Sequence, residues 1–174
     1  MELLALLFSV ALGRLTVEES NQKTLESCIH EDSIEVQWEK VDVLPIMMAC
    51  QMERRRAKAQ GRKVRKIVIT SICREDGSRR SKHYNCAATD FYYFYLADWN
   101  ECDVWNAYLN DALDILYWCD ETDTPCRNGI YDNLSHHLDL EGRWASWGFI
   151  EGVQYSYRHV LSWIEEKIED VCHG

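Results

Sequence analysis

Eight cysteines in a chain of 174 residues are the feature that most restricts how this protein can fold. Their number is even, and no two of them form a Cys-x-x-Cys motif, so the spacing typical of zinc ribbons and thioredoxin-like sites is missing. Four disulfides formed in an oxidising compartment are the better interpretation. The eight cysteines are Cys28, Cys50, Cys73, Cys86, Cys102, Cys119, Cys126 and Cys172.

Four cysteines fall in each half of the chain, and we expect the outer two and the inner two of each half to pair. In the second half, Cys102 and Cys119 bracket a predicted helix that would hold them about 25 Å apart, which is too far for a disulfide. We therefore expect Cys102 to pair with Cys172, and Cys119 with Cys126. The corresponding pairs in the first half are Cys28 with Cys86 and Cys50 with Cys73.

The N-terminus carries an apolar segment, Leu3 to Leu12, followed by small residues that suit cleavage after Gly13. This pattern predicts a signal peptide over residues 1–13, although the usual positive charge before the apolar segment is missing. The alternative is an amphipathic or buried first helix. No other apolar run approaches the roughly 20 residues of a membrane span. We therefore expect a secreted, extracellular protein with no membrane span and an N-glycosylation sequon at Asn133.

Apolar periodicity predicts mostly helices. The clearest stripes run from about residue 102 to 116 and from 153 to 171, with a shorter helical segment over 131–140. Residues 47–60 have a helix-forming composition. Residues 64–73 are rich in β-branched side chains and could be either helix or strand.

The helix signals favour a mainly α-helical fold, a disulfide-stabilised bundle in two halves of similar size. The first half, residues 20–90, holds a basic segment, and the second comprises residues 91–174. Pro45 suits the start of one helix, and Asp98 or Asn100 can cap another. The aromatic run beginning at Phe91 indicates an interior segment packed on more than one face.

Charge is unevenly distributed along the chain. Residues 53–82 carry 12 Arg and Lys against 3 Asp and Glu, whereas residues 83–174 carry 4 against 17. One explanation is internal neutralisation, in which the basic segment lies against the acidic second half. The other is an exposed basic surface that contacts an anionic partner. The candidate partner-binding residues are Arg54, Arg55, Arg56, Lys58, Arg62, Lys63, Arg65 and Lys66.

We expect the stretch from Arg54 to Lys66 to lie on the surface, because an unpaired charge removed from water costs several kcal/mol. It could be a solvated helix and loop, a partner-binding surface, or a site of prohormone-type processing near Arg65. Nucleic acid is a less suitable partner, because the stretch lacks the interleaved aromatic residues that stack on bases.

Catalytic motifs are scarce, since the sequence has no Gly-x-Ser-x-Gly, no His-Glu-x-x-His and no glycine-rich phosphate loop. The densest histidine pair is His136 and His137. On the helix predicted there, adjacent side chains point about 100° apart, so the two do not face one metal ion. We expect no metal site, no cofactor and no catalysis.

Two similar units carry a tyrosine two residues before a cysteine. Tyr84 precedes Cys86 and Tyr117 precedes Cys119, with Cys73 and Cys102 further upstream. In these motifs the chain resembles the BICYCLE family of secreted aphid effectors, which is named for two cysteine–tyrosine–cysteine motifs. The resemblance implies a salivary-gland protein that enters plant tissue and alters host development, with no enzymatic activity implied.

We thus expect a secreted, disulfide-stabilised binding protein that acts on host tissue through surface contacts with a host protein or an anionic surface. One alternative is a small secreted hydrolase with a site near His136, His137 and His159. The other is a processed hormone or cytokine-like ligand. Tyr84 and Tyr117 would have structural roles beside their disulfides.

Overall fold

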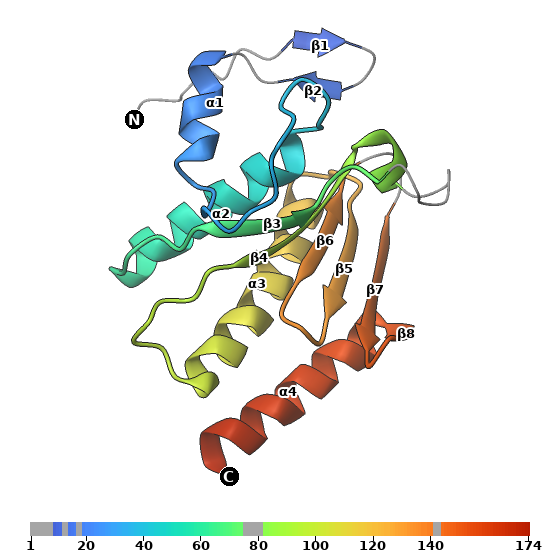
Figure 1. Cartoon of the computed structure of the whole chain (residues 1–174). Helices are drawn as coiled ribbons and strands as arrows, with labels where there is room; N and C mark the ends of the chain where they lie inside the picture. The colour runs from blue at the N-terminus through green and yellow to red at the C-terminus, as the bar shows by residue number, and fades with distance from the viewer. Residues whose placement is uncertain (1–8, 12–13, 17–18, 75–81, 141–143) are drawn as a thin grey trace.

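A six-stranded mixed sheet, and not a helical bundle, organises the computed structural model, which describes residues 9–11, 14–16, 19–74, 82–140 and 144–174 (Figure 1). The strands lie in the order β3-β4-β6-β5-β7-β8, in which β5 and β7 are parallel and the other neighbours antiparallel. Their bounds are Ile67–Ser71 for β3, Ala88–Tyr93 for β4, Arg127–Tyr131 for β5, His136–Asp139 for β6, Ala145–Ile150 for β7 and Val153–Ser156 for β8. The prediction of a mainly α-helical bundle is therefore wrong, and the fold is α/β.

Helices and a small hairpin complete the described elements. A hairpin of β1, Ser9–Ala11, and β2, Arg14–Thr16, precedes the rest, and the predicted signal peptide otherwise lies outside the described residues. The remaining elements are α1 (Glu19–Glu26), α2 (Leu44–Gln60), the 3-10 helix η1 (Lys82–Asn85), α3 (Glu101–Glu121) and α4 (Tyr157–His173). None of the helices in the described part of the chain is long and apolar enough to span a bilayer.

Local signals explain where the long helices begin and end. Pro45 occupies the first turn of α2, and Gly61 ends the helix in the left-handed conformation at φ 63°, which a residue without Cβ adopts readily. At the start of α3, the side chain of Asn100 accepts a hydrogen bond from the backbone of Asp103, and Asp103 reciprocates in a capping box. Both helices therefore match the sequence-based expectation closely.

The segment over residues 131–140 is a strand pair and not the predicted helix. It contains the end of β5, a turn in which Leu134 takes a φ of 66°, and strand β6. All four residues of β6 are buried although three of them are polar, so hydrophobicity does not alternate along the strand. A strand whose polar residues are buried on both faces gives no period-2 signal.

One face of the sheet packs against the helices. A cluster of buried residues joins Tyr108 and Ala112 of α3, Ile130 of β5, and Val160 and Ile164 of α4. A second cluster joins α2, β3 and β4 with the C-terminal part of α3. The core thus lies between the helices and one face of the sheet, and the opposite face of the sheet lies outside this core.

All eight cysteines form disulfides, and each pair lies within one half of the chain, as expected. In the second half, Cys102–Cys172 and Cys119–Cys126 are confirmed. Cys102–Cys172 links the beginning of α3 to the end of α4, which packs along it. Four disulfides are consistent with an extracellular protein.

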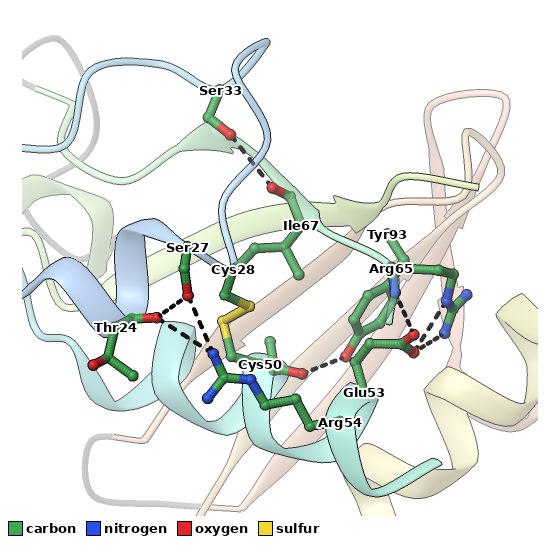
Figure 2. The surroundings of a disulfide bond; sticks show 11 residues. Thr24, Ser27, Cys28, Ser33, Cys50, Glu53, Arg54, Arg65, Ile67 and Tyr93 are labelled. Carbon is green, nitrogen blue, oxygen red and sulfur yellow. Dashed lines mark hydrogen bonds and ion pairs between the residues drawn. A yellow bond between two sulfur atoms is a disulfide. The ribbon is translucent and has the colours of Figure 1, made fainter. Parts of the chain in front are cut away.

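The predicted pairs Cys28–Cys86 and Cys50–Cys73 are wrong, because Cys28 pairs with Cys50 and Cys73 with Cys86. Cys28 follows α1 and faces α2, which carries Cys50, so their Cα atoms lie 6.0 Å apart (Figure 2). Cys73 follows β3 and Cys86 precedes β4. Because β3 and β4 are antiparallel neighbours, these two cysteines meet at the same end of the pair, with Cα atoms 4.4 Å apart.

The expected boundary between residues 20–90 and 91–174 falls inside β4. Strand β4 lies between β3, which belongs to the first half, and β6, which belongs to the second half, and it pairs with both. Residues from both halves therefore lie on the same sheet, and this brings distant polar side chains together.

Candidate metal centre

Strand register places four residues in one row across the sheet. Asp90 of β4 is paired with His137 of β6, His137 with Gly129 of β5, and Gly129 with Trp147 of β7. Side chains alternate between the two faces along a strand. Since Leu138, the neighbour of His137, belongs to the core, the row lies on the face away from the helices.

Gly129 makes room for the floor of a pocket on this face. A Cβ atom at this position would lie 2.9 Å from Nε1 of Trp147 and 3.1 Å from Cβ of His137, so a side chain does not fit between them. The pocket has a volume of about 690 Å³ and is lined by Asp90, His137 and Trp147 among others. That volume is typical of a small-molecule binding site.

A third ionisable side chain, His83, enters the pocket from outside the sheet. It lies in η1, inside the loop that the Cys73–Cys86 disulfide closes, and it is buried. Its Nδ1 lies 2.8 Å from the backbone oxygen of Ile72. A carbonyl oxygen can only accept, so Nδ1 carries the proton and Nε2 of the neutral ring is left as an acceptor directed into the pocket.

Three ligand-type atoms converge there. Oδ1 of Asp90 lies 3.1 Å from Nε2 of His83 and 2.8 Å from Nδ1 of His137. The two nitrogen atoms are 3.2 Å apart. His83, Asp90 and His137 form the group in the described residues whose donor atoms could hold a metal ion together.

A second carboxylate orients His137 from behind. Nε2 of His137 lies 3.2 Å from Oδ2 of Asp139, which is fully buried and lies 3.6 Å from Arg127. Nε2 therefore donates to Asp139, and Nδ1 is directed at Asp90 and His83. Metal-binding histidines ordinarily have this arrangement, in which the nitrogen that does not bind the metal donates to a carboxylate or a carbonyl.

Asp90 and His137 shift each other's titration. Burial alone would raise the pKa of the Asp90 carboxyl, but its contacts with the imidazoles of His137 and His83, which donate to it when they are protonated, outweigh burial and hold that pKa well below its ordinary value. Burial alone would lower the pKa of His137, but its hydrogen bonds to Asp139 and Asp90 raise it. The site thus keeps Asp90 ionised and favours positive charge beside it.

The converging atoms require a cation among them. Two imidazole lone pairs and a carboxylate oxygen repel one another at these distances, unless a proton on His137 or a metal ion lies between them. In a tetrahedral zinc site with metal–ligand bonds of about 2.0–2.2 Å, neighbouring ligand atoms are roughly 3.3–3.6 Å apart. The three observed separations of 2.8, 3.1 and 3.2 Å are each shorter, so the three side chains must move slightly apart to hold a metal ion.

The histidines singled out from the sequence are not brought together. His136 points to the opposite face of the sheet from His137, where it packs near Phe91 and Tyr108. Burial, aided by nearby arginine charges, lowers the pKa of His136 to about 3, so it is neutral. His159 is exposed on α4 and stacks on Tyr155 at 4.6 Å. Of the three, His137 alone belongs to the described pocket.

Sequence reasoning missed His83 and Asp90 and did not expect a metal site. No local motif joins His83, Asp90 and His137, because they come from η1, β4 and β6. A strand assignment for β6 would have placed His137 and Asp139 on one face, which is the one local signal of this site.

The basic stretch is divided between the interior and the surface. Arg65 is 1% exposed and forms an ion pair with Glu53 over the ring of Tyr93 (Figure 2). It forms a second ion pair with Asp111. Arg62 also pairs with Glu53. The prediction that the whole stretch lies on the surface is thus wrong for Arg65, because buried carboxylates balance its charge.

Arg56 follows the same pattern, since it pairs with Asp111 and Asp114 of α3. The explanation by internal neutralisation therefore holds for Arg56 and Arg65. Arg54 is exposed and lies near the end of α1, where it donates to the backbone of Thr24 (Figure 2). The other exposed members of the predicted partner-binding set are Arg55, Lys58, Lys63 and Lys66.

The remaining predicted residues lie at the surface. Tyr84 is 44% exposed and Tyr117 is 62% exposed, and the Tyr117 hydroxyl donates to Glu121. Asn133 lies in the turn between β5 and β6 and lines the pocket, and its Oδ1 accepts from Ser135.

No protein-family model, curated protein or solved structure matches this chain. The resemblance to BICYCLE effectors therefore rests on the cysteine and tyrosine residues quoted above.

Proposed function

We propose that His83, Asp90 and His137 bind one divalent transition-metal ion of the zinc class, and that the protein acts through this ion as an extracellular metalloprotein. The observation that carries the proposal is the convergence of Nε2, Oδ1 and Nδ1 within 3.2 Å of one another. Both imidazoles also have their other nitrogen engaged by an acceptor, as metal-binding histidines require.

The ligand set supports a reactive site more than a purely structural one. Structural zinc sites are closed by four protein ligands, whereas catalytic sites have three and keep a position for water or substrate. Here three side chains from the described residues supply ligand atoms at the edge of a pocket of about 690 Å³. A bound zinc ion lowers the pKa of its water to about 7 and polarises ligand oxygens, which suits hydrolytic chemistry.

Of His136, His137 and His159, which the alternative hydrolase hypothesis grouped together, the proposed metal site contains His137 alone. The plant-effector role that the resemblance implies, and binding through the exposed basic residues, stay predictions.

Zinc titration of the purified, disulfide-bonded protein by calorimetry tests the proposal. We expect one zinc ion per chain. His83→Ala and His137→Ala should each weaken zinc binding strongly. The loss should exceed the roughly 10–100-fold decrease in affinity that follows when a residue that only hydrogen-bonds to a metal ligand is removed. His159→Ala is the matched control, since it removes an exposed histidine outside the pocket and should leave zinc affinity unchanged.

Circular dichroism of each variant establishes that the fold is retained. If the folded wild type does not bind zinc, or if His83→Ala and His137→Ala bind it as tightly as the wild type, the proposal is wrong.

A further inference from the structure

Cationic side chains surround the proposed metal centre. Among the described residues that line the pocket, Arg74, Lys82 and Arg127 are basic, whereas Asp90 is the one carboxylate. This concentration of positive charge occurs in a chain whose formal net charge is −10. Arg74 is paired with Asp90 and Arg127 lies 3.6 Å from Asp139, so among these described residues three basic side chains face two carboxylates, a balance that favours an anionic ligand in this pocket.

Two of these cations are held in fixed orientations. The guanidinium of Arg74 donates to Oδ2 of Asp90 at 2.8 Å and to the hydroxyl of Ser71 at 2.8 Å, while its side chain remains 50% exposed. The guanidinium of Arg127 lies over the ring of Trp147, 5.5 Å from its centroid. An oriented guanidinium presents parallel N–H groups that match the oxygens of a phosphate.

Aromatic side chains form another wall of the same pocket. Tyr131 and Phe149 stack with their centroids 5.5 Å apart and their planes at 5°, and Trp147 lies beside them on β7. All three are half-buried, so part of each faces the pocket. Aromatic rings in this setting stack on planar groups such as nucleobases.

We propose that the pocket binds a phosphate ester that carries a planar ring, a ligand of the mononucleotide type. The phosphate lies at the open position of the metal and beside Arg74 and Arg127, and the ring lies against Trp147 and Phe149. This inference rests on the proposed metal site. A polynucleotide fits less well, because the net negative charge of the chain opposes a long polyanion.

Calorimetry on the zinc-loaded protein with three probes, adenosine 5′-monophosphate, adenosine and inorganic phosphate, tests the inference. The monophosphate should bind at least about tenfold tighter than either of the other two, which corresponds to about 1.4 kcal/mol. Removal of zinc should weaken binding of the monophosphate and of phosphate, and leave that of adenosine unchanged.

Two variants separate the contacts. Arg127→Gln should weaken binding of both the monophosphate and phosphate, whereas Trp147→Leu should weaken binding of the monophosphate alone. The controls are Arg158→Gln on the exposed surface of α4 and Trp144→Leu, whose side chain is 52% exposed and does not line this pocket. Both controls should bind all probes as the wild type does.

Zinc content measured on the same samples distinguishes the two proposals. If the protein holds one zinc ion and the monophosphate binds no more tightly than adenosine, the nucleotide inference is wrong while the metal site stands. Equal affinity for the monophosphate with and without zinc also overturns the inference. Failure to bind zinc overturns the proposed function itself.

Discussion

Nε2 of His83 lies 3.2 Å from Nδ1 of His137, although 54 positions separate the two residues in the sequence. Three features of the fold produce this contact. The antiparallel pairing of β4 with β6 fixes His137 beside Asp90, and the Cys73–Cys86 disulfide closes the loop from which His83 reaches the same place. The carbonyl of Ile72 then sets the orientation of the His83 ring.

Asp139→Asn should weaken zinc binding although Asp139 does not contact the ion. The side-chain amide introduced by this substitution can donate a hydrogen bond to Nε2 of His137, which favours the tautomer with the proton on Nδ1, where the metal should bind. We expect zinc affinity to fall about 10–100-fold, with the fold retained. Zinc calorimetry checks this, with Asp170→Asn on exposed α4 as the control. An unchanged zinc affinity would show that Asp139 does not orient His137 for metal binding.

Removing the Cys73–Cys86 disulfide should weaken zinc binding more than removing Cys102–Cys172, although the latter disulfide closes a longer loop. The Cys73→Ser/Cys86→Ser variant should lose about 3 kcal/mol of unfolding free energy, and zinc affinity should fall because His83 lies inside the released loop. The Cys102→Ser/Cys172→Ser variant opens a loop with a sequence separation of 70 and should lose about 4 kcal/mol.

Zinc affinity of the second variant should nevertheless equal that of the wild type at a temperature where both are folded. Urea denaturation and zinc titration of the two variants provide the comparison. If both lose zinc affinity to the same extent, the loop from Cys73 to Cys86 has no special role in placing His83.

Glu53 should make stability depend on pH in the acid range. Burial alone would raise the pKa of Glu53, but hydrogen bonds from Arg62 and Arg65 lower it below its ordinary value. A carboxyl with a lowered folded-state pKa stabilises the fold above its unfolded pKa of about 4.3, and this contribution is lost as pH falls below that value.

Glu53→Gln should therefore be less stable than the wild type at pH 7, by about 3–5 kcal/mol, because it leaves Arg65 with one buried carboxylate fewer. Its unfolding free energy should also fall less steeply between pH 5 and about pH 3. Urea denaturation across this range measures both effects, and Glu166→Gln on the exposed face of α4 is the control. A wild-type slope in the Glu53→Gln variant would contradict this assignment.

The sequence predicts α2 and α3 well, because Pro45, Gly61 and Asn100 mark their ends and apolar residues recur at helical spacing. It does not predict β6, since His136, His137 and Asp139 are buried polar residues on both faces of one strand. The polar composition of such a segment predicts that it is exposed to solvent. The polar contacts that justify its burial come from β4 and η1, and only the folded chain supplies them.

The basic stretch is a second case in which local sequence does not predict burial, because here a residue expected to be exposed is buried. Charge density predicted exposure for Arg65, and long-range packing placed it between Glu53 and Asp111. The metal centre is likewise set by pairing among β4, β6 and the loop that carries His83. Local sequence could place His137 beside Asp139 once a strand was assumed, but it could not bring Asp90 to the same point.

A crystal structure of the zinc-soaked protein, with anomalous data collected on both sides of the zinc edge, tests the metal centre most directly. We expect one strong anomalous peak within about 2.0–2.2 Å of Nε2 of His83, Oδ1 of Asp90 and Nδ1 of His137. The peak should disappear in His137→Ala and persist in His159→Ala. A saturating soak that leaves this position without a peak, or that places zinc only on surface residues, would contradict the assignment of this pocket as a metal site.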